Sequence, residues 1–292
     1  MFANHRRSLR HLLLLIFTYV TSAKGAAGLY LCRSRNWSNK AIHANLGKIR
    51  ESIWRTRDRT PLTGIVHVDG GYFCGKPRKS NYRRRKRDHQ LISDRIAGRR
   101  RETGTSPWRA RGMTRRNWEK RQKRRVIMVL RQVEPKIGAI RTITAVAESE
   151  NERDALMLIR RFVSPDAIVM TDENPAYSNV SATHQHYAVN HSECFVNADG
   201  VNENQAESFF SRQRRCEYGT THGMRAIYLA DHSAEMEWRE DTRRRPLSQL
   251  IEDVLKKALT SGYSRWWRGY YQGNHRGAEI LMDQESNGGK AQ

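Results

Sequence analysis

The chain has 292 residues, of which 38% are hydrophobic, and it carries a formal net charge of +23 at pH 7. This length allows one or two domains with enough core for an enzyme, while the low hydrophobic fraction indicates that part of the chain is loop or disordered. The charge predicts attraction to a polyanion, with nucleic acid favoured over an anionic membrane surface and over a merely basic soluble surface.

The cysteines give no framework for the fold. Cys32, Cys74, Cys194 and Cys216 include no C-x-x-C pair. This spacing argues against a zinc ribbon and does not support a set of disulfides. We therefore expect reduced thiols in a cytoplasmic protein.

The first 60 residues predict three helices. Residues 11–20 are apolar and follow several basic residues, as in a secretory signal, but the run is too short to span a membrane. A core helix is favoured because Lys24-Gly25 forms a turn, residues 26–35 form a second helix, and Ser38 can cap a third helix over residues 39–53.

The third helix has one apolar face and one polar face. The polar, outer face would carry Lys40, His43, Asn45, Lys48 and Arg50. This layout is typical of a small helix-turn-helix module whose last helix enters the DNA major groove. A secretory signal, or a core helix without a role in DNA binding, remains the alternative.

A buried strand is predicted after the charged linker of residues 55–61. Residues 64–68 are apolar and end at Asp69, and Gly70-Gly71 then permits a tight turn or a returning hairpin strand. The composition changes sharply over residues 76–125, which hold 21 of the 53 Lys and Arg residues. We expect this insertion to be disordered when free and to clamp onto phosphates when DNA is present.

Strands and helices alternate in the rest of the chain, which predicts an α/β fold with a mixed sheet flanked by helices. Asp172 follows one of the short apolar strands. The predicted strands are residues 126–130, 138–146, 167–170 and 186–189, and the predicted helices are residues 152–163, 175–180, 201–215, 228–239 and a C-terminal helix after residue 245.

The helix over residues 201–215 places Glu207 and Arg214 two turns apart on one face, with Phe209 and Phe210 as its apolar side. Together with Asp69 and Asp172, Glu207 completes a set of three carboxylates. Such a set suits two Mg²⁺ ions, with Mn²⁺ as a substitute, and phosphoryl transfer.

Other residues are weaker candidates for this site. Asn204 is the nearest rival to Glu207 as the third ligand, and Asp199 is a further rival that a helix cap explains equally well. Glu173 is expected to be structural or to support Asp172. A zinc site is disfavoured because His184, His186, His191 and Cys194 do not have the spacing of a closed site.

Several motifs in one order resemble the DDE-type transposases of bacterial insertion sequences. They are VHVDGGYFCGK, VMTDENPAYSNV, the VNHS stretch at residues 189–192, VNENQAESFFSRQRR, GTTHGM and EMEWRED. The resemblance covers residues 63–245, and more loosely residues 10–52. It implies a ribonuclease-H-like catalytic domain and Mg²⁺-dependent DNA cleavage and strand transfer.

Carried onto this chain, the resemblance makes Asp69, Asp172 and Glu207 the catalytic triad and Arg214 the residue that positions the element end. The chain departs from the family at Gly70, where an acid is usual, and it lacks the cysteines of an N-terminal zinc ribbon. We therefore expect a reduced helix-turn-helix-like module over residues 1–60. A catalytic domain over residues 61–245 and a C-terminal helix and tail over residues 246–292 would follow.

The sequence thus predicts a transposase that acts on double-stranded DNA at element ends and at target sites, as a homo-oligomer, in the bacterial cytoplasm at the nucleoid and without a membrane partner. The alternatives are a DNA-binding remnant without catalysis and a basic RNA-binding or ribosome-associated protein.

Overall fold

The computed structural model describes residues 5, 7–74, 115, 124–189 and 204–282. The chain divides into two compact units, one that combines Met1–Phe73 with Arg125–Gln292 and one that comprises Cys74–Arg124. Only three residues of the second unit are described, so the predicted disorder and DNA contacts of the basic insertion lie outside the described residues. All elements named below belong to the first unit.

A five-stranded mixed sheet has the strand order β3-β2-β1-β4-β5. Its strands are β1 (Ile65–Phe73), β2 (Arg125–Glu134), β3 (Gly138–Ala147), β4 (Ile168–Asp172) and β5 (Gln185–Val189). The strands β1, β2 and β3 pair antiparallel, whereas β4 pairs parallel with both β1 and β5. The predicted mixed sheet flanked by helices is confirmed, with five strands in the predicted order along the chain.

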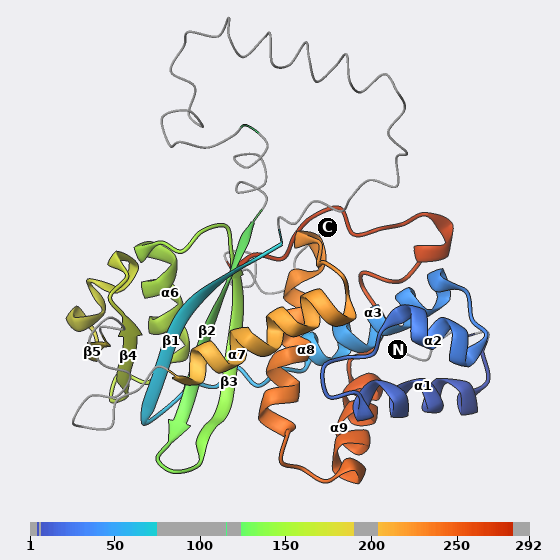
Figure 1. The fold of residues 1–292 in the computed structure, drawn as a ribbon, viewed down its shortest axis with the longest axis horizontal. Coiled ribbons are helices and arrows are strands. Elements are labelled where there is room, and N and C mark those ends of the chain that lie inside the picture. Colours follow the sequence, from blue (N-terminus) through green and yellow to red (C-terminus); the bar gives the residue numbers. More distant parts are fainter. Residues whose placement is uncertain (1–4, 6, 75–114, 116–123, 190–203, 283–292) are drawn as a thin grey trace, which may run out of the picture. The chain divides into compact units, whose positions relative to one another are not determined.

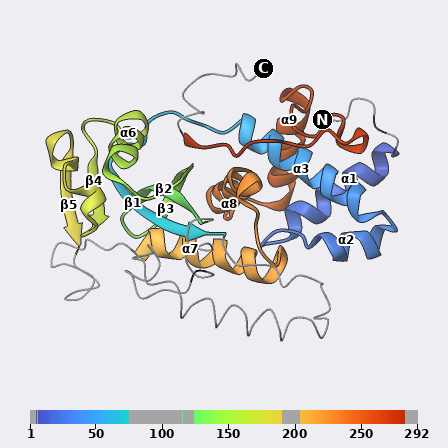
Figure 2. The ribbon, with the colours of Figure 1, turned by 90° about the horizontal axis from the view of Figure 1, so that it is seen from above.

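Helices cover the sheet on both sides (Figures 1 and 2). Helix α6 (Glu152–Phe162) buries Ala155, Leu158, Ile159 and Phe162 in a core shared with β1 to β4. Helix α7 (Asn204–Arg215) contacts β1 and β2 and lies on the opposite side of the sheet from α6 (Figure 2). Each face therefore has its own covering helix, as expected for a sheet buried on both sides.

Two local predictions differ from the structure. The β1 strand continues through Asp69 and both glycines to Phe73, so the prediction of a tight turn or a returning hairpin strand at Gly70-Gly71 is wrong. These glycines serve close packing in an extended strand, since a Cβ at either position would lie within 3 Å of another side chain. Residues 175–182 form two short 3₁₀ turns, Pro175–Tyr177 and Val180–Ala182, because polar side chains take up backbone groups there.

Three helices form the N-terminal part, as predicted: α1 (Leu9–Thr21), α2 (Gly28–Arg35) and α3 (Asn39–Arg55). The Ser38 hydroxyl accepts a hydrogen bond from the Ala41 amide, which confirms the predicted helix cap. The three helices share one apolar core with Trp238 and with residues of α9 (Leu247–Thr260). No helix in the described part of the chain has the length and apolar character needed to cross a membrane.

The predicted outer face of α3 is largely covered, and this prediction is wrong. Arg50 is only 7% exposed, and the ring of His43 packs edge-on against Trp267 and Tyr228. Both faces of α3 are occupied because α8 (Leu229–Thr242) contacts it along one side and the chain after α9 crosses the other. Only Lys40 of the five predicted DNA-facing residues is exposed.

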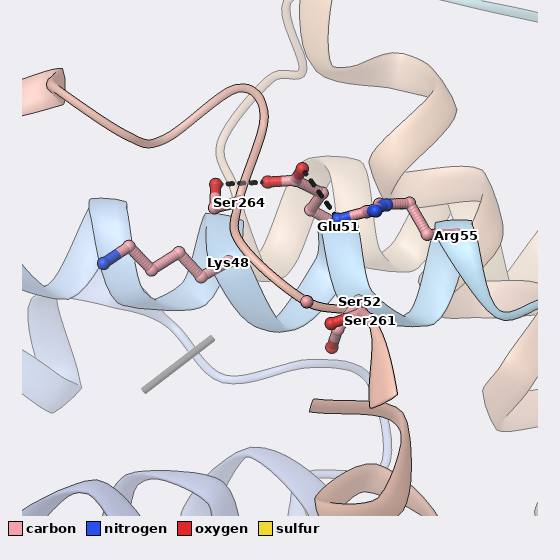
Figure 3. Close-up of a pocket in the computed structure, with 7 residues that line it drawn as sticks. Lys48, Glu51, Ser52, Arg55, Ser261 and Ser264 are labelled. Carbon is pink, nitrogen blue, oxygen red and sulfur yellow. Dashed lines mark hydrogen bonds and ion pairs between the residues drawn. The ribbon is translucent and has the colours of Figure 1, made fainter. Parts of the chain in front are cut away.

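The chain after α9 is held to α3 by polar contacts (Figure 3). Glu51 accepts hydrogen bonds from the Ser264 hydroxyl and from the Arg265 amide, the latter at 2.6 Å. Arg55 donates to the Tyr263 carbonyl at 2.8 Å. The small gap between Lys48, Ser52 and Ser261 in Figure 3 therefore belongs to the interface where the chain after α9 packs against α3.

We expect Gly47→Ala to destabilise the protein, although alanine normally favours a helix interior. A Cβ at Gly47 would lie 2.0 Å from the Trp267 ring, so the ring and its segment would have to move. Overpacking of this kind costs about 1–3 kcal/mol, which exceeds the helix-propensity gain of about 1 kcal/mol. Denaturant unfolding measures the change.

Gly28→Ala is the matched control, because a Cβ at Gly28 in α2 meets no atom within 4 Å. It should leave stability unchanged or raise it slightly. A Gly47→Ala protein as stable as the Gly28→Ala protein would contradict the packing of Trp267 on α3.

Helix α8 carries an unusual number of buried charges. Its carboxylates bind arginines of α8 and of other elements, and two of them bind backbone amides of β3, so that α8 lies along the β3 edge of the sheet. The contacts are Asp231 with Arg276, Glu235 with Arg50 and Arg239, Glu237 with the Thr144 amide, Glu240 with Arg131, Arg212 and Arg243, and Asp241 with the Thr142 amide. The edge amides of β3 are therefore satisfied by a helix instead of by another strand.

Candidate active site

The register of β1 and β4 aligns the first two predicted acids. Ile65 pairs with Ile168 and His67 pairs with Met170 in this parallel ladder. The same register, continued by two residues, brings Asp69 opposite Asp172 with both side chains on one face of the sheet. Each of the two acids is half-buried.

Helix α7 crosses this same face and carries the third predicted acid. A Cβ at Gly71 would lie 2.6 Å from the Phe210 ring, so the helix approaches β1 closely next to Asp69. Glu207 is exposed and lies one turn before Phe210 on α7. Arg131 of β2 fixes the start of the helix by donating to the Gln205 carbonyl at 2.6 Å.

The carboxylates act on one another electrostatically. Burial raises the pKa of Asp69 to about 7, and the neighbouring charge of Asp172 contributes next. The Gly70 amide, which donates to Asp69 at 2.6 Å, lowers this pKa, while Glu150 and Glu207 raise it further. Asp69 is therefore within electrostatic reach of both other predicted acids.

The donor set fits a hard divalent cation, since it consists of carboxylate oxygens. None of these carboxylates forms an ion pair with a described residue, in contrast to the α8 acids Asp231, Glu235 and Glu240. As the side chains stand, no three His, Cys, Asp or Glu residues of the described ranges are close enough to hold one metal ion. Repulsion between like charges keeps such side chains apart, so binding a cation would require them to turn inward.

Arg214 lies two turns after Glu207 and is exposed. Its guanidinium carbon is 5.8 Å from the ring centres of Phe73 and of Phe210, which places it beside the end of β1. It forms no ion pair with any described residue. Arg212, two residues earlier, is by contrast paired with the buried carboxylate of Glu240.

The weaker candidates take other positions. His186 shares a hydrogen bond of 2.9 Å with the Thr171 hydroxyl, and His184 contacts the hydroxyl of Thr183. Glu173 is exposed next to Asp172. His191, Cys194 and Asp199, together with the side chain of Asn204, lie outside the described residues.

One acid at this site was not anticipated from the sequence. Glu150 lies between β3 and α6, and its carboxylate is 2.5 Å from the place of a Cβ at Gly70. Burial raises the pKa of Glu150, a hydrogen bond from Tyr177 opposes this, and Asp172 raises it further. The only sequence signal was an acid placed just before the N-cap of a helix, which capping alone explains.

A mixed sheet of this order, with acids aligned on β1 and β4 and a helix across them, defines the ribonuclease-H-like domain of a DDE-type transposase. The chain belongs to the ISXO2-like transposase family, since residues 61–241 match the ISXO2-like transposase domain. No curated protein matches the chain.

Proposed function

We propose that this transposase cleaves DNA at the ends of an insertion sequence and joins the freed ends to target DNA. The observation that carries the proposal is the β1–β4 register, which aligns Asp69 with Asp172 on the face crossed by α7. Family membership gives the class of protein, and the chemistry is supported by carboxylates that form no ion pair with any residue the structure describes. Glu207 completes the catalytic triad.

Asp69, Asp172 and Glu207 would hold two Mg²⁺ ions, or Mn²⁺ ions in their place. The ions would stabilise charge on the attacking and leaving oxygens of an in-line displacement at phosphorus. The role of the protein is to fix the carboxylates on rigid elements, two on adjacent strands and one on a packed helix. Asp69 must be ionised to act as a ligand, so a cation would release its proton below about pH 7.

Water attacks the phosphodiester at the element end, and the 3′-hydroxyl that is released attacks the target strand. No covalent link between protein and DNA is required. Arg214 would hold a DNA phosphate next to the acids by paired hydrogen bonds, which a lysine could not reproduce. The high net charge of the chain supplies attraction to both duplexes.

Pairing two element ends requires at least two copies of the chain, and we propose a homo-oligomer on DNA. Double-stranded DNA in the bacterial cytoplasm, at the nucleoid, is the proposed partner, and no membrane partner is proposed. The helices α1 to α3 remain a candidate DNA-binding module. DNA could contact the face of α3 that carries Arg50 only if α3 separated from α8, because Arg50 is paired with Glu235 of α8.

The test is an end-cleavage assay with the full chain. Genomic DNA flanking the gene supplies the element end, recognised as an inverted repeat bracketed by short direct duplications. A labelled duplex carrying this end should be cut with a 3′-hydroxyl product in Mg²⁺ and remain intact in EDTA. Salt-sensitive binding without cleavage in Mg²⁺ or Mn²⁺ would instead identify a DNA-binding remnant.

A further inference from the structure

The strap, residues 262–278, runs along one side of α3 after α9 has ended (Figure 3). Its buried Trp267 packs on Gly47, where a Cβ would lie 2.0 Å from the ring. The helix positions that it contacts are spaced three or four residues apart and so lie on one face of α3. They are Lys40, His43, Gly47, Glu51 and Arg55. The strap is therefore an ordered part of the surface of this helical module.

The composition of the strap differs from that of the chain as a whole. It holds three arginines and five aromatic residues but no acidic residue. Packing on α3 accounts for only part of this set, because Trp267 is 4% exposed whereas Tyr263 is 65% and Tyr271 is 51% exposed. The strap also lies outside residues 61–241, which match the family domain, so family membership gives it no role.

The cations at the strap fall into two sets. Arg276 is neutralised inside the fold, where it donates to both carboxylate oxygens of Asp231. Arg265 and Arg268 are exposed and form no ion pair with any residue that the structure describes. Lys40 is likewise exposed without an ion pair among the described residues, and it donates to a strap carbonyl at 3.5 Å. The outer side of the strap is therefore cationic.

Aromatic rings lie beside two of these exposed cations. The guanidinium carbon of Arg268 is 5.8 Å from the ring centre of Tyr263, and the Lys40 ammonium nitrogen is 5.5 Å from that of Tyr271. A neighbouring ring restricts a long cationic side chain, so less conformational entropy is lost when that side chain binds an anion. The two tyrosine hydroxyls add hydrogen-bond donors of the kind that contact phosphate oxygens.

The length of the cationic strip suits duplex DNA. The strip extends along α3 from Tyr263, which accepts from Arg55, to Tyr271, which accepts from Lys40. This part of the helix is about 22 Å long. A duplex carries one phosphate charge about every 1.7 Å of its axis, so several phosphates fall within reach of such a surface. Arginine, lysine and tyrosine without acids are the residues that contact a sugar-phosphate backbone.

We propose that the outer side of the strap, together with Lys40, binds the phosphate backbone of the duplex at the element end. Arg265, Arg268 and Lys40 make the charged contacts. Tyr263 and Tyr271 add hydroxyl donors at the two ends of the strip. The buried face of α3 need not be exposed for this contact. This inference rests on the proposed function for the identity of the duplex, but it requires neither a metal ion nor cleavage.

The test is binding of the full chain to a labelled element-end duplex in EDTA over a range of salt concentrations. Each lost phosphate contact makes the slope of log affinity against log salt concentration shallower by about 0.9. The double variant Arg265→Gln, Arg268→Gln should therefore have a slope shallower by about 1.8, and Lys40→Gln alone by about 0.9. The affinity of the double variant should fall at least about tenfold at 0.1 M salt, and equally on an unrelated duplex, because phosphate contacts do not depend on sequence.

The double variant Arg153→Gln, Arg160→Gln is the matched control, because it removes the same charge from exposed arginines of α6. It should keep a slope and an affinity close to those of the unmodified chain. Thermal unfolding confirms that each variant is folded. An unchanged slope for the variant Arg265→Gln, Arg268→Gln would overturn the proposal, and so would an equal loss of slope in the α6 control.

Cleavage by the unmodified chain separates this inference from the proposed function. If the unmodified chain cuts the element end in Mg²⁺ and the strap variant binds DNA with an unchanged slope, the strap is not a DNA-binding surface but the proposed function stands. If the unmodified chain cuts no element end and the strap variant loses slope, the proposed function fails while the strap is still a DNA-binding surface.

Discussion

Asp172→Asn is expected to reduce Mg²⁺-dependent cleavage of an element end by about a thousandfold or more. The amide has the shape of the carboxylate but no charge, so the site loses a ligand that stabilises the cation in the transition state. A thousandfold loss corresponds to about 4 kcal/mol of transition-state stabilisation. Single-turnover cleavage of a labelled duplex measures the rate.

Binding of the same duplex in EDTA should not be weakened by Asp172→Asn, since without metal the substitution only removes a negative charge that repels phosphates. Glu173→Gln is the matched control, because this acid is adjacent in sequence and exposed. Its cleavage rate should stay close to that of the unmodified protein. Cleavage by Asp172→Asn at the unmodified rate would rule out a role for this residue in metal binding.

Glu235→Gln is expected to produce the largest loss of stability. Glu235 is 2% exposed and accepts hydrogen bonds from Arg50 at 2.6 Å and from Arg239 at 2.9 Å. Neutralising it leaves two buried guanidinium groups without a counter-charge, which costs about 3–5 kcal/mol. The melting temperature should fall by roughly 6–20 °C for a fold of this size.

The exposed acid Glu252 of α9 provides the control, and Glu252→Gln should change stability by no more than about 0.5 kcal/mol. The pH dependence gives a second check. Burial alone would raise the pKa of Glu235, but Arg50 and Arg239 outweigh it and lower the pKa to about 2. Because the folded pKa lies below the unfolded value of 4.5, the stabilisation is complete above pH 4.5 and is lost towards pH 2.

The destabilisation by Glu235→Gln, measured by denaturant unfolding, should therefore be smaller at pH 3.5 than at pH 7. A difference in stability that is independent of pH would show that the ion pairs of Glu235 with Arg50 and Arg239 do not account for it. Arg239 links Glu235 to α1 through the carbonyls of Tyr19 and Ser22, so this single carboxylate joins the N-terminal helices to α8.

Much of the fold was predictable because the local sequence pattern of most strands and helices matches the structure that they form. Short apolar runs gave the five strands, and the spacing of Ile42, Leu46 and Ile49 gave the buried side of α3. Asp69 and Asp172 were identified because each follows a short apolar run. Their alignment is a property of strand order, which local pattern does not specify.

Two of the errors, at Arg50 and at Gly70-Gly71, arise from contacts with parts of the chain that are distant in sequence. Arg50 looked exposed because α3 is amphipathic, yet its partner Glu235 is 185 residues away. Gly70-Gly71 looked like a turn because glycine is common in turns, while the structure uses both glycines for close contact with Glu150 and Phe210. Neither contact leaves a signal in the neighbouring sequence.

The central claim is that Asp69, Asp172 and Glu207 share divalent cations. Anomalous diffraction from crystals of the full chain grown with Mn²⁺ tests it most directly. We predict manganese peaks within about 2–2.5 Å of carboxylate oxygens of Asp69 and Asp172, with Glu207 turned towards them. Crystals whose only manganese lies away from these three side chains would contradict the claim.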